Sequence, residues 1–413
     1  MIRLCMMLLW FGIVGAVSAS SSHAMTLEEA LATALRQNPE LQELRLEAES
    51  AEAQLDKARL PLIANPVLET SGSRREMDPE EEGGSVTNYG VRLSQEFEVA
   101  GQRSIRIEVA QKNLSRVGFE IADRERMLRH EVKEAYATAL ASKERISLAK
   151  EVVKLREDLL DLTRTKYRAG DVSALEVNLA EVEAVKARSE LVAAEQSHRD
   201  AILSLQGVTG TGIDLLPSVV EGELTPDVIG VPDRQTLRNA LRERPDIKAA
   251  ALEVDRSNRA VDLVRREAIP NPSLGAFYDR DELRSDVGMV LSISIPLFDR
   301  KQAERREARA RLEQARIKRA GLDLTIEREF DEAYTNLVSS LRQLSLYKKE
   351  IVVKSLENLD LLNLAFKEGK IGFYDIRLAQ RDAIDVRFAY LDALLRAEQA
   401  INNMERTTGG NLR

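Results

Sequence analysis

Two acidic residues stand at matching places near the starts of two predicted helices. Glu176 lies six residues after Gly170, and Asp375 lies six residues after Gly369. In the first turn of a helix, a carboxylate complements the positive end of the helix dipole and can accept hydrogen bonds from free backbone N–H groups. Where several carboxylates converge, they repel one another and attract cations. Helix capping and cation attraction are both compatible with this spacing.

Other residues capable of chemistry are isolated. His130 and His198 each stand alone on a polar helical pattern, which predicts solvated side chains, and the methionines are scattered. Gly207 and Gly210 do not follow a strand, so no phosphate-binding loop is predicted. We interpret the acidic run at 80–82 as a solvated loop. No nucleophile–base arrangement is recognisable, and the sequence predicts neither an enzyme nor a cofactor or metal site.

The segment that carries Glu176 occurs twice in the chain. Residues 166–210 match residues 365–409 without a gap, 199 positions later, and the shared residues include Arg188 with Arg387. In both copies a long helical pattern ends at a glycine, and a second helical pattern begins directly afterwards. This order predicts an antiparallel helical hairpin. Both acids are therefore placed at the start of a returning helix.

The duplication covers nearly the whole chain. Matches lie 206 positions apart before the predicted strands and 198 apart within them, as for Pro39 with Pro245 and Gly90 with Gly288. A proline-rich segment between the halves predicts a linker with little regular structure. The predicted division is a first repeat at 25–210, a linker at 211–234 and a second repeat at 235–409.

Each repeat has the same order of elements. Two helices separated by a proline lead into two extended segments, and a long helical hairpin follows. The long helices predicted at 102–168 and 301–367 contain no proline. Each would span about 100 Å, which indicates an elongated molecule. The predicted β-hairpins lie at about 66–97 and 272–296, and the helical hairpins lie at 102–207 and 301–406.

The extended segments show a period of two. Tyr89, Val91 and Leu93 share one face of the first segment, with polar or small residues between them. Leu291 and Ile293 do the same in the second segment. Strict alternation predicts strands with one apolar face. With their weaker partners at 67–73 and 273–279, these segments predict four strands in the chain.

The N-terminus predicts export. An apolar run from Leu4 to Val17 follows Arg3, which is typical of a signal peptide at 1–24, cleaved after Ala19 or Ala24, with an uncleaved anchor as the alternative. The single cysteine lies in this segment. No later segment is apolar enough to form a membrane helix. The net charge of −8 comes from intermixed signs, so no nucleic-acid-binding face is predicted.

Four strands are too few to close a membrane barrel, because the smallest such barrels have about eight. An open sheet would also leave its edge strands unpaired. The chain is predicted to be exported, its strands have an apolar face, and it lacks a membrane helix. Together these features predict an outer-membrane β-barrel shared between chains. Three copies would supply twelve strands and would continue the barrel as a tube of helices.

The sequence resembles the TolC family of outer-membrane efflux proteins over essentially the whole mature chain. The resemblance is carried by the twofold repeat, by residues 167–170 with their counterpart at 366–369, and by the strand-to-helix passages. The passages at 93–103 and 294–301 are similar to those of the heavy-metal cation-efflux (CzcC-like) branch. The resemblance implies a mainly α fold with a small β part. It also implies a homotrimer in outer-membrane lipid, a twelve-stranded barrel and a periplasmic helical barrel. A periplasmic adaptor and an inner-membrane pump of the RND type would dock below it.

The resemblance also assigns roles to the hairpin ends. Glu176 and Asp375 would form rings at the periplasmic aperture, while helix capping remains the alternative interpretation. Leu378 departs from members that carry a second acid there, so the ring would be weaker. The turns would dock the adaptor, although this chain lacks the valine that many members have before the glycine. The docking residues would be Ala169, Gly170, Asp171, Glu368, Gly369 and Lys370.

The sequence is compatible with three functions. The first is a passive exit duct for a metal-ion efflux pump, and the second is the same duct serving drug efflux or type I protein secretion. The third is a periplasmic coiled-coil structural protein, which the strands with one apolar face disfavour.

Overall fold

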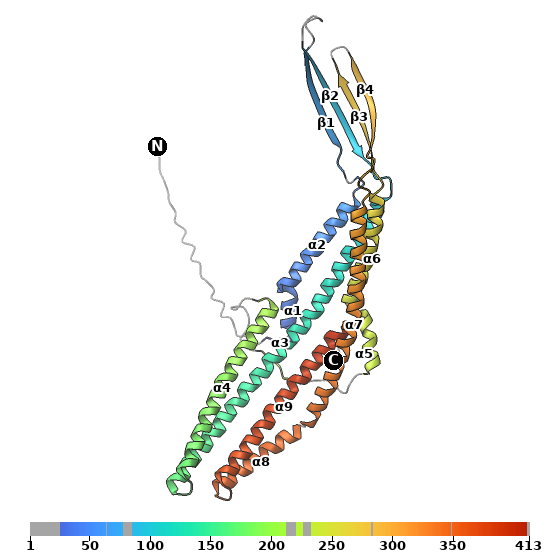
Figure 1. Ribbon diagram of the computed structural model, residues 1–413. Helices are drawn as coiled ribbons and strands as arrows, with labels where there is room; N and C mark the ends of the chain where they lie inside the picture. The colour runs from blue at the N-terminus through green and yellow to red at the C-terminus, as the bar shows by residue number, and fades with distance from the viewer. Residues whose placement is uncertain are drawn as a thin grey trace, which may run out of the picture.

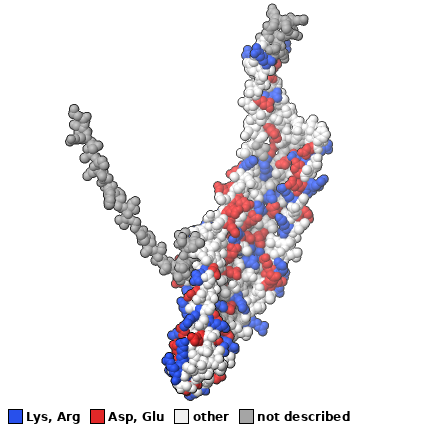
Figure 2. Space-filling model, turned by 60° about the vertical axis from the view of Figure 1, so that its left-hand side comes forward, with Lys and Arg blue, Asp and Glu red and all other residues white. Residues whose placement is uncertain are grey.

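The computed structural model describes residues 25–62, 64–76, 85–211, 220–225, 233–281, 284–347 and 349–410. The predicted signal peptide at 1–24 and the acidic run at 80–82 lie outside these residues. The molecule is elongated, with the strands at one end and two helical hairpin turns at the other (Figure 1). Its helical surface carries acidic and basic side chains in mixture (Figure 2).

The two repeats contain the same elements in the same order. The first consists of α1 (Leu27–Gln37), α2 (Pro39–Arg59), β1 (Val67–Glu76), β2 (Ser85–Glu96), α3 (Gln102–Ala169) and α4 (Ala174–Thr209). The second consists of α5 (Arg234–Ala240), the 3-10 helix η1 (Leu241–Glu243), α6 (Pro245–Glu267), β3 (Pro272–Arg280), β4 (Ser285–Ile293), α7 (Gln302–Leu346), α8 (Lys349–Lys367) and α9 (Phe373–Thr408). Among the described helices, none combines the length and the apolar content needed to cross a bilayer.

Local residue choices set the helix boundaries. Thr26 and Glu29 form a capping box at the start of α1, and Asn38 caps α2 with Pro39 in its first turn. These side chains satisfy backbone N–H groups that have no partner inside the helix. Asn38 also donates from Nδ2 to Val208 O over 3.1 Å and so ties the start of α2 to the end of α4.

The prediction of one continuous helix at 301–367 is wrong. α7 ends at Leu346, Tyr347 has ψ near 63°, and α8 begins at Lys349. Neither proline nor glycine stands at this break. α7 and α8 both pack against α9, and the chain changes direction between them (Figure 1).

The four strands form one antiparallel sheet in the order β1-β2-β3-β4, which confirms the four strands predicted from the period of two. β1 runs to Glu76, three residues beyond the strand predicted at 67–73, and β2 begins at Ser85, four residues before Tyr89. β4 ends at Ile293, three residues before the end of the β-hairpin predicted at about 272–296. Pro296 lacks the N–H group that a longer ladder would require. Residues that share the apolar face of β4 stay exposed, including Met289 at 73% and Leu291 at 64%.

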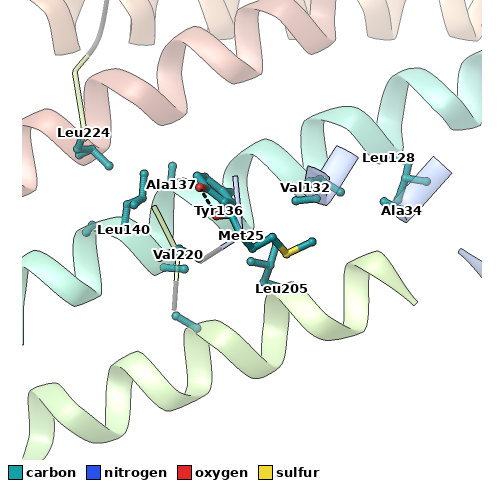
Figure 3. Close-up of a cluster of buried hydrophobic side chains, with 14 of the residues drawn as sticks. Met25, Ala34, Leu128, Val132, Tyr136, Ala137, Leu140, Leu205, Val220 and Leu224 are labelled. Carbon is teal, nitrogen blue, oxygen red and sulfur yellow. Dashed lines mark hydrogen bonds between the residues drawn. The ribbon is translucent and has the colours of Figure 1, made fainter. Parts of the chain in front are cut away.

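The main hydrophobic cluster lies midway along the molecule and gathers α1, α3, α4 and the segment 220–225. Tyr136 on α3 stands at its centre with Met25, Val220 and Leu205 around it (Figure 3). Its hydroxyl lies 2.8 Å from Met25 O and also contacts Glu221 O. The described part of the linker is thereby fixed against the first repeat.

Candidate functional site

Both helical hairpins turn at the end of the molecule opposite the sheet (Figure 1). Gly170 has φ of 85° and Gly369 has φ of 74°, a left-handed conformation that glycine adopts at little cost. Asp171 N donates to Lys166 O over 2.9 Å, and Lys370 N donates to Ala365 O over 2.8 Å. The same hydrogen-bonded helix ending therefore closes both hairpins. All six residues of the two predicted docking turns are exposed.

Glu176 and Asp375 both cap the returning helices. Glu176 Oε2 accepts hydrogen bonds from Ser173 N over 2.6 Å and from Ser173 Oγ over 3.0 Å. Asp375 Oδ2 accepts from Gly372 N over 3.0 Å. The half-buried Glu176 and the exposed Asp375 thus have the capping role in the single chain. This role leaves one oxygen of each carboxylate available for other contacts, since a carboxylate accepts at both oxygens.

An aromatic cluster holds the two hairpins together just above the turns. Phe366 and Phe373 pack with Ile376 and with Leu160 of the first hairpin, and the two phenyl rings lie 6.5 Å apart. Lys166 of the first hairpin places its ammonium 5.4 Å from the centre of the Phe366 ring. The positions of the two turns are therefore coupled by direct packing.

A buried polar network joins the same two hairpins farther from the turns than the aromatic cluster. Arg156 on α3 is only 6% exposed and donates from Nη1 to Gln380 Oε1 over 2.9 Å. Arg377 on α9 donates to Glu183 Oε1 on α4 over 2.8 Å. Burial opposes the ionisation of Glu183, but the Arg377 hydrogen bond and the Arg156 charge outweigh it, so the pKa of Glu183 is lowered. Burial also lowers the pKa of Arg156.

Sequence reasoning missed this network. The alternating steps of four and three from Leu148 to Leu162 are typical of a coiled-coil seam and would make Leu155 a core position. In the structure Arg156 is the buried residue and Leu155 is half-buried. A charged residue next to an apolar seam looks solvated in the sequence alone. Glu183 and Arg377, which are 194 positions apart, give no local signal of their pairing.

The prediction that both histidines are solvated is wrong. His130 Nδ1 lies 3.2 Å from Asn402 O, and its Nε2 lies 3.1 Å from Glu134 Oε2. His198 Nδ1 lies 2.8 Å from Ser142 Oγ, and burial lowers the pKa of His198. Within the described residues, no three or more His, Cys, Asp or Glu side chains are grouped so as to hold a metal ion.

Comparison with known proteins gives the family context of this arrangement. A family model described as "Outer membrane efflux protein" matches residues 30–211 and 236–410. The cobalt-zinc-cadmium resistance protein CzcC of Cupriavidus metallidurans is 25% identical over 388 residues, which cover 93% of this chain and 90% of the relative. The antibiotic efflux pump outer membrane protein ArpC of Pseudomonas putida is 26% identical over 412 residues, covering 92% of this chain and 79% of the relative. A crystal structure of a membrane protein from Pseudomonas aeruginosa superposes with a TM-score of 0.78 at 21% identity, covering 93% of this chain and 92% of that one.

Proposed function

The chain belongs to the outer membrane efflux protein family, and on that basis we propose that it is the exit duct for divalent heavy-metal cations. It is an outer-membrane efflux channel of tripartite systems, without enzymatic activity, and it extends into the periplasm. In the proposed system, an inner-membrane pump of the RND type would deliver the cations through a periplasmic adaptor. The signal peptide at 1–24 would direct export.

The metal specificity rests on one observation, the match to CzcC along nearly the full length of both chains. That match covers 90% of the relative, which is named for cobalt, zinc and cadmium resistance. The antibiotic efflux relative is covered over 79% of its length. A duct needs no specific contact with its cargo, so relatedness over the whole chain carries more weight here than any single residue.

The proposed assembly is a homotrimer whose four-stranded sheets together form a twelve-stranded barrel. This arrangement would cover the exposed apolar side chains of β2 and β4 with lipid. The repeats at 25–210 and 235–409, joined by 211–234, would form a ring of six similar units. Six helical hairpins would then line the periplasmic end.

We assign the periplasmic aperture to Glu176 and Asp375. Both carboxylates cap helices that start at the hairpin end, so threefold symmetry would place three of each around the channel axis. Rings of carboxylates favour cations in a pore. The exposed turns Ala169–Asp171 and Glu368–Lys370 would be the contact sites of the adaptor.

The second candidate cargo is an organic compound, which the antibiotic efflux relative favours. The test is deletion of the gene in its source organism, followed by growth in graded cobalt, zinc, cadmium, antibiotics and toluene. Sensitivity to the metals alone, restored by the gene on a plasmid, is the expected result. Sensitivity to the organic compounds alone would overturn the metal assignment, and a loss of protein secretion would favour type I secretion.

A further inference from the structure

A cavity of about 700 Å³ lies where the two repeats meet, between α1 and α3 of the first repeat and η1 and α9 of the second. Its volume falls within the range of about 300–1,000 Å³ that is typical of small-molecule sites. The proposed aperture and docking residues lie elsewhere, at the hairpin end of the molecule (Figure 1). All residues that line the cavity belong to one chain, so each copy contains a complete cavity.

Asn402 on α9 is an unusual residue of this lining. It is only 1% exposed, and within the described residues neither the oxygen nor the nitrogen of its side-chain amide has a hydrogen-bond partner. Its backbone is held in place, because its carbonyl oxygen lies 3.2 Å from His130 Nδ1. A buried amide without a partner costs stability, which makes this side chain a candidate ligand contact. The duplication does not account for it, because the residue 199 positions earlier is Leu203.

The lining has more basic than acidic side chains. The basic residues are Arg126, Arg129, Lys133, Arg244 and Arg406, and the acidic residues are Glu28, Glu243 and Glu405. Two of the acids are engaged by lysines, since Lys133 Nζ lies 2.5 Å from Glu405 and Lys248 Nζ, outside the lining, lies 2.7 Å from Glu243. The cavity therefore favours an anionic ligand.

The basic residues differ in how closely they are paired. Arg126 Nη2 lies 2.7 Å from Asp123 Oδ1, which holds that guanidinium in place. Arg129 Nη2 lies 3.7 Å from Glu125 Oε2, which is beyond hydrogen-bond distance, and its side chain is 51% exposed. The guanidinium of Arg129 is thus available to an anionic group that enters the cavity.

We propose that this cavity binds the carboxyl end of a peptide, with Asn402 pairing with a backbone amide and Arg129 with the terminal carboxylate. An asparagine amide has an acceptor and a donor side by side, which match the N–H and C=O groups of a peptide. A guanidinium matches the two oxygens of a carboxylate. Phosphate has acceptor oxygens for the arginine but offers no comparable donor to Asn402 Oδ1. The excess of basic residues disfavours the charged amino end of a peptide.

Two sources in the periplasm supply such an end, namely proteins, which end in L residues, and cell-wall peptides, which end in D residues. The probes are therefore acetylated trialanine in the L form and acetyl-L-Ala-D-Ala-D-Ala, both with a free carboxylate. The C-terminal amides of both peptides and inorganic phosphate are the controls. Binding is measured by saturation-transfer NMR with protein extracted from outer membranes and purified in detergent, and the proposal is independent of which cargo the duct carries.

Two variants test the named contacts. Asn402→Leu introduces the residue type that the first repeat has at this position. Replacing an unpaired buried amide by an apolar side chain of similar shape is nearly neutral for stability, so the resistance of the protein to heat should be kept. Arg129→Gln changes an exposed residue and tests the proposal even if the first variant fails to fold. Arg164→Gln is the matched control, because Arg164 also lies on α3, is 45% exposed and lies 3.4 Å from Glu181.

We expect at least one of the two carboxylate peptides to bind, and its C-terminal amide to bind more weakly. Arg129→Gln and Asn402→Leu should each weaken binding about tenfold, as expected for the loss of one hydrogen-bonded group. Arg164→Gln should bind as the wild type does. Binding of the L or of the D peptide identifies the source. The proposal is overturned if neither peptide binds, if the amides or phosphate bind as well as the carboxylates, or if Arg129→Gln leaves binding unchanged.

Discussion

Arg377 on α9 and Glu183 on α4 form an ion pair that joins the two helical hairpins. Both Nε and Nη2 of Arg377 donate to Glu183 Oε1, over 3.2 and 2.8 Å. The other carboxylate oxygen of Glu183 lies 3.8 Å from Nη2 of the buried Arg156. The negative charge of Glu183 therefore interacts with two guanidinium groups. The polar contact between the two helical hairpins depends on that charge.

This arrangement predicts that acid weakens the hairpin contact. The pKa of Glu183 is lowered in the folded protein from an ordinary value of 4.5. Its stabilising effect is thus fully present above pH 4.5 and is lost as the pH falls through the lower, folded-state pKa. At pH 7, Glu183→Gln should cost about 1.5–3 kcal/mol, typical of a hydrogen bond to a charged group. Thermal unfolding followed by circular dichroism should show this difference at pH 7 and a smaller one below pH 4.5.

Glu157→Gln is the matched control, because Glu157 pairs with Arg188 on the exposed surface of the same hairpin. Exposed pairs contribute at most about 1 kcal/mol. If Glu183→Gln and Glu157→Gln lowered the unfolding temperature equally, the special role of the Glu183 network would be wrong.

Features with a strong local cause could be predicted from the sequence. The turns at Gly170 and Gly369 are predictable because few other residues adopt positive φ there without strain. The strands are predictable because apolar residues recur at every second position of β4, at Met289, Leu291 and Ile293. The break at Tyr347 is not predictable in this way, because neither proline nor glycine marks it in the sequence.

The candidate site shows the same division. The spacing of Glu176 and Asp375 from their glycines places both in a first helical turn, where the structure finds capping hydrogen bonds. The Arg156 network depends on contacts between residues more than 190 positions apart, such as Glu183 with Arg377. Periodicity within one helix contains no information on such contacts. Aperture and docking roles depend on other chains and stay proposals.

A substitution pair tests which face of the sheet meets lipid. Leu93 is 52% exposed on the apolar face, and Ser94 lies on the opposite face. Leu93→Arg should cost about 2–4 kcal/mol near the bilayer midplane, whereas Ser94→Arg should be tolerated in a water-filled lumen. Recovery of heat-resistant trimers from outer membranes measures both effects. Equal losses of trimer would contradict the proposed orientation of the sheet.

The aperture proposal predicts a change in ion selectivity. Glu176→Gln combined with Asp375→Asn keeps a side-chain oxygen that can cap each helix and removes both charges. Cation selectivity in planar bilayers should fall. Stability should fall by about 0.3–1 kcal/mol per residue, because each neutral cap loses the interaction of a charge with the helix dipole. Leu378→Glu is the converse variant, because Leu378 is 51% exposed on the same helix as Asp375, and it should raise cation selectivity. Unchanged selectivity in the neutral variant would leave helix capping as the role of both acids.

The last prediction concerns the docking turns. Gly369 has positive φ, and a Cβ atom there would meet nothing nearer than Lys166 Nζ at 3.9 Å. Gly369→Val should therefore add backbone strain of about 1–3 kcal/mol at the turn without a steric clash. The sheet lies at the other end of the molecule, so the barrel should still assemble. We expect a correctly inserted trimer that neither restores efflux nor crosslinks to the adaptor.

Gly321→Val is the matched control, since Gly321 lies inside helix α7 with open space around its Cα. It replaces a glycine by the same residue away from any turn, where valine costs less than about 1 kcal/mol relative to alanine. This variant should retain both efflux and adaptor crosslinking. Wild-type crosslinking by Gly369→Val would show that the second turn is not a docking site, because a strained and displaced turn could not preserve a contact that depends on its shape.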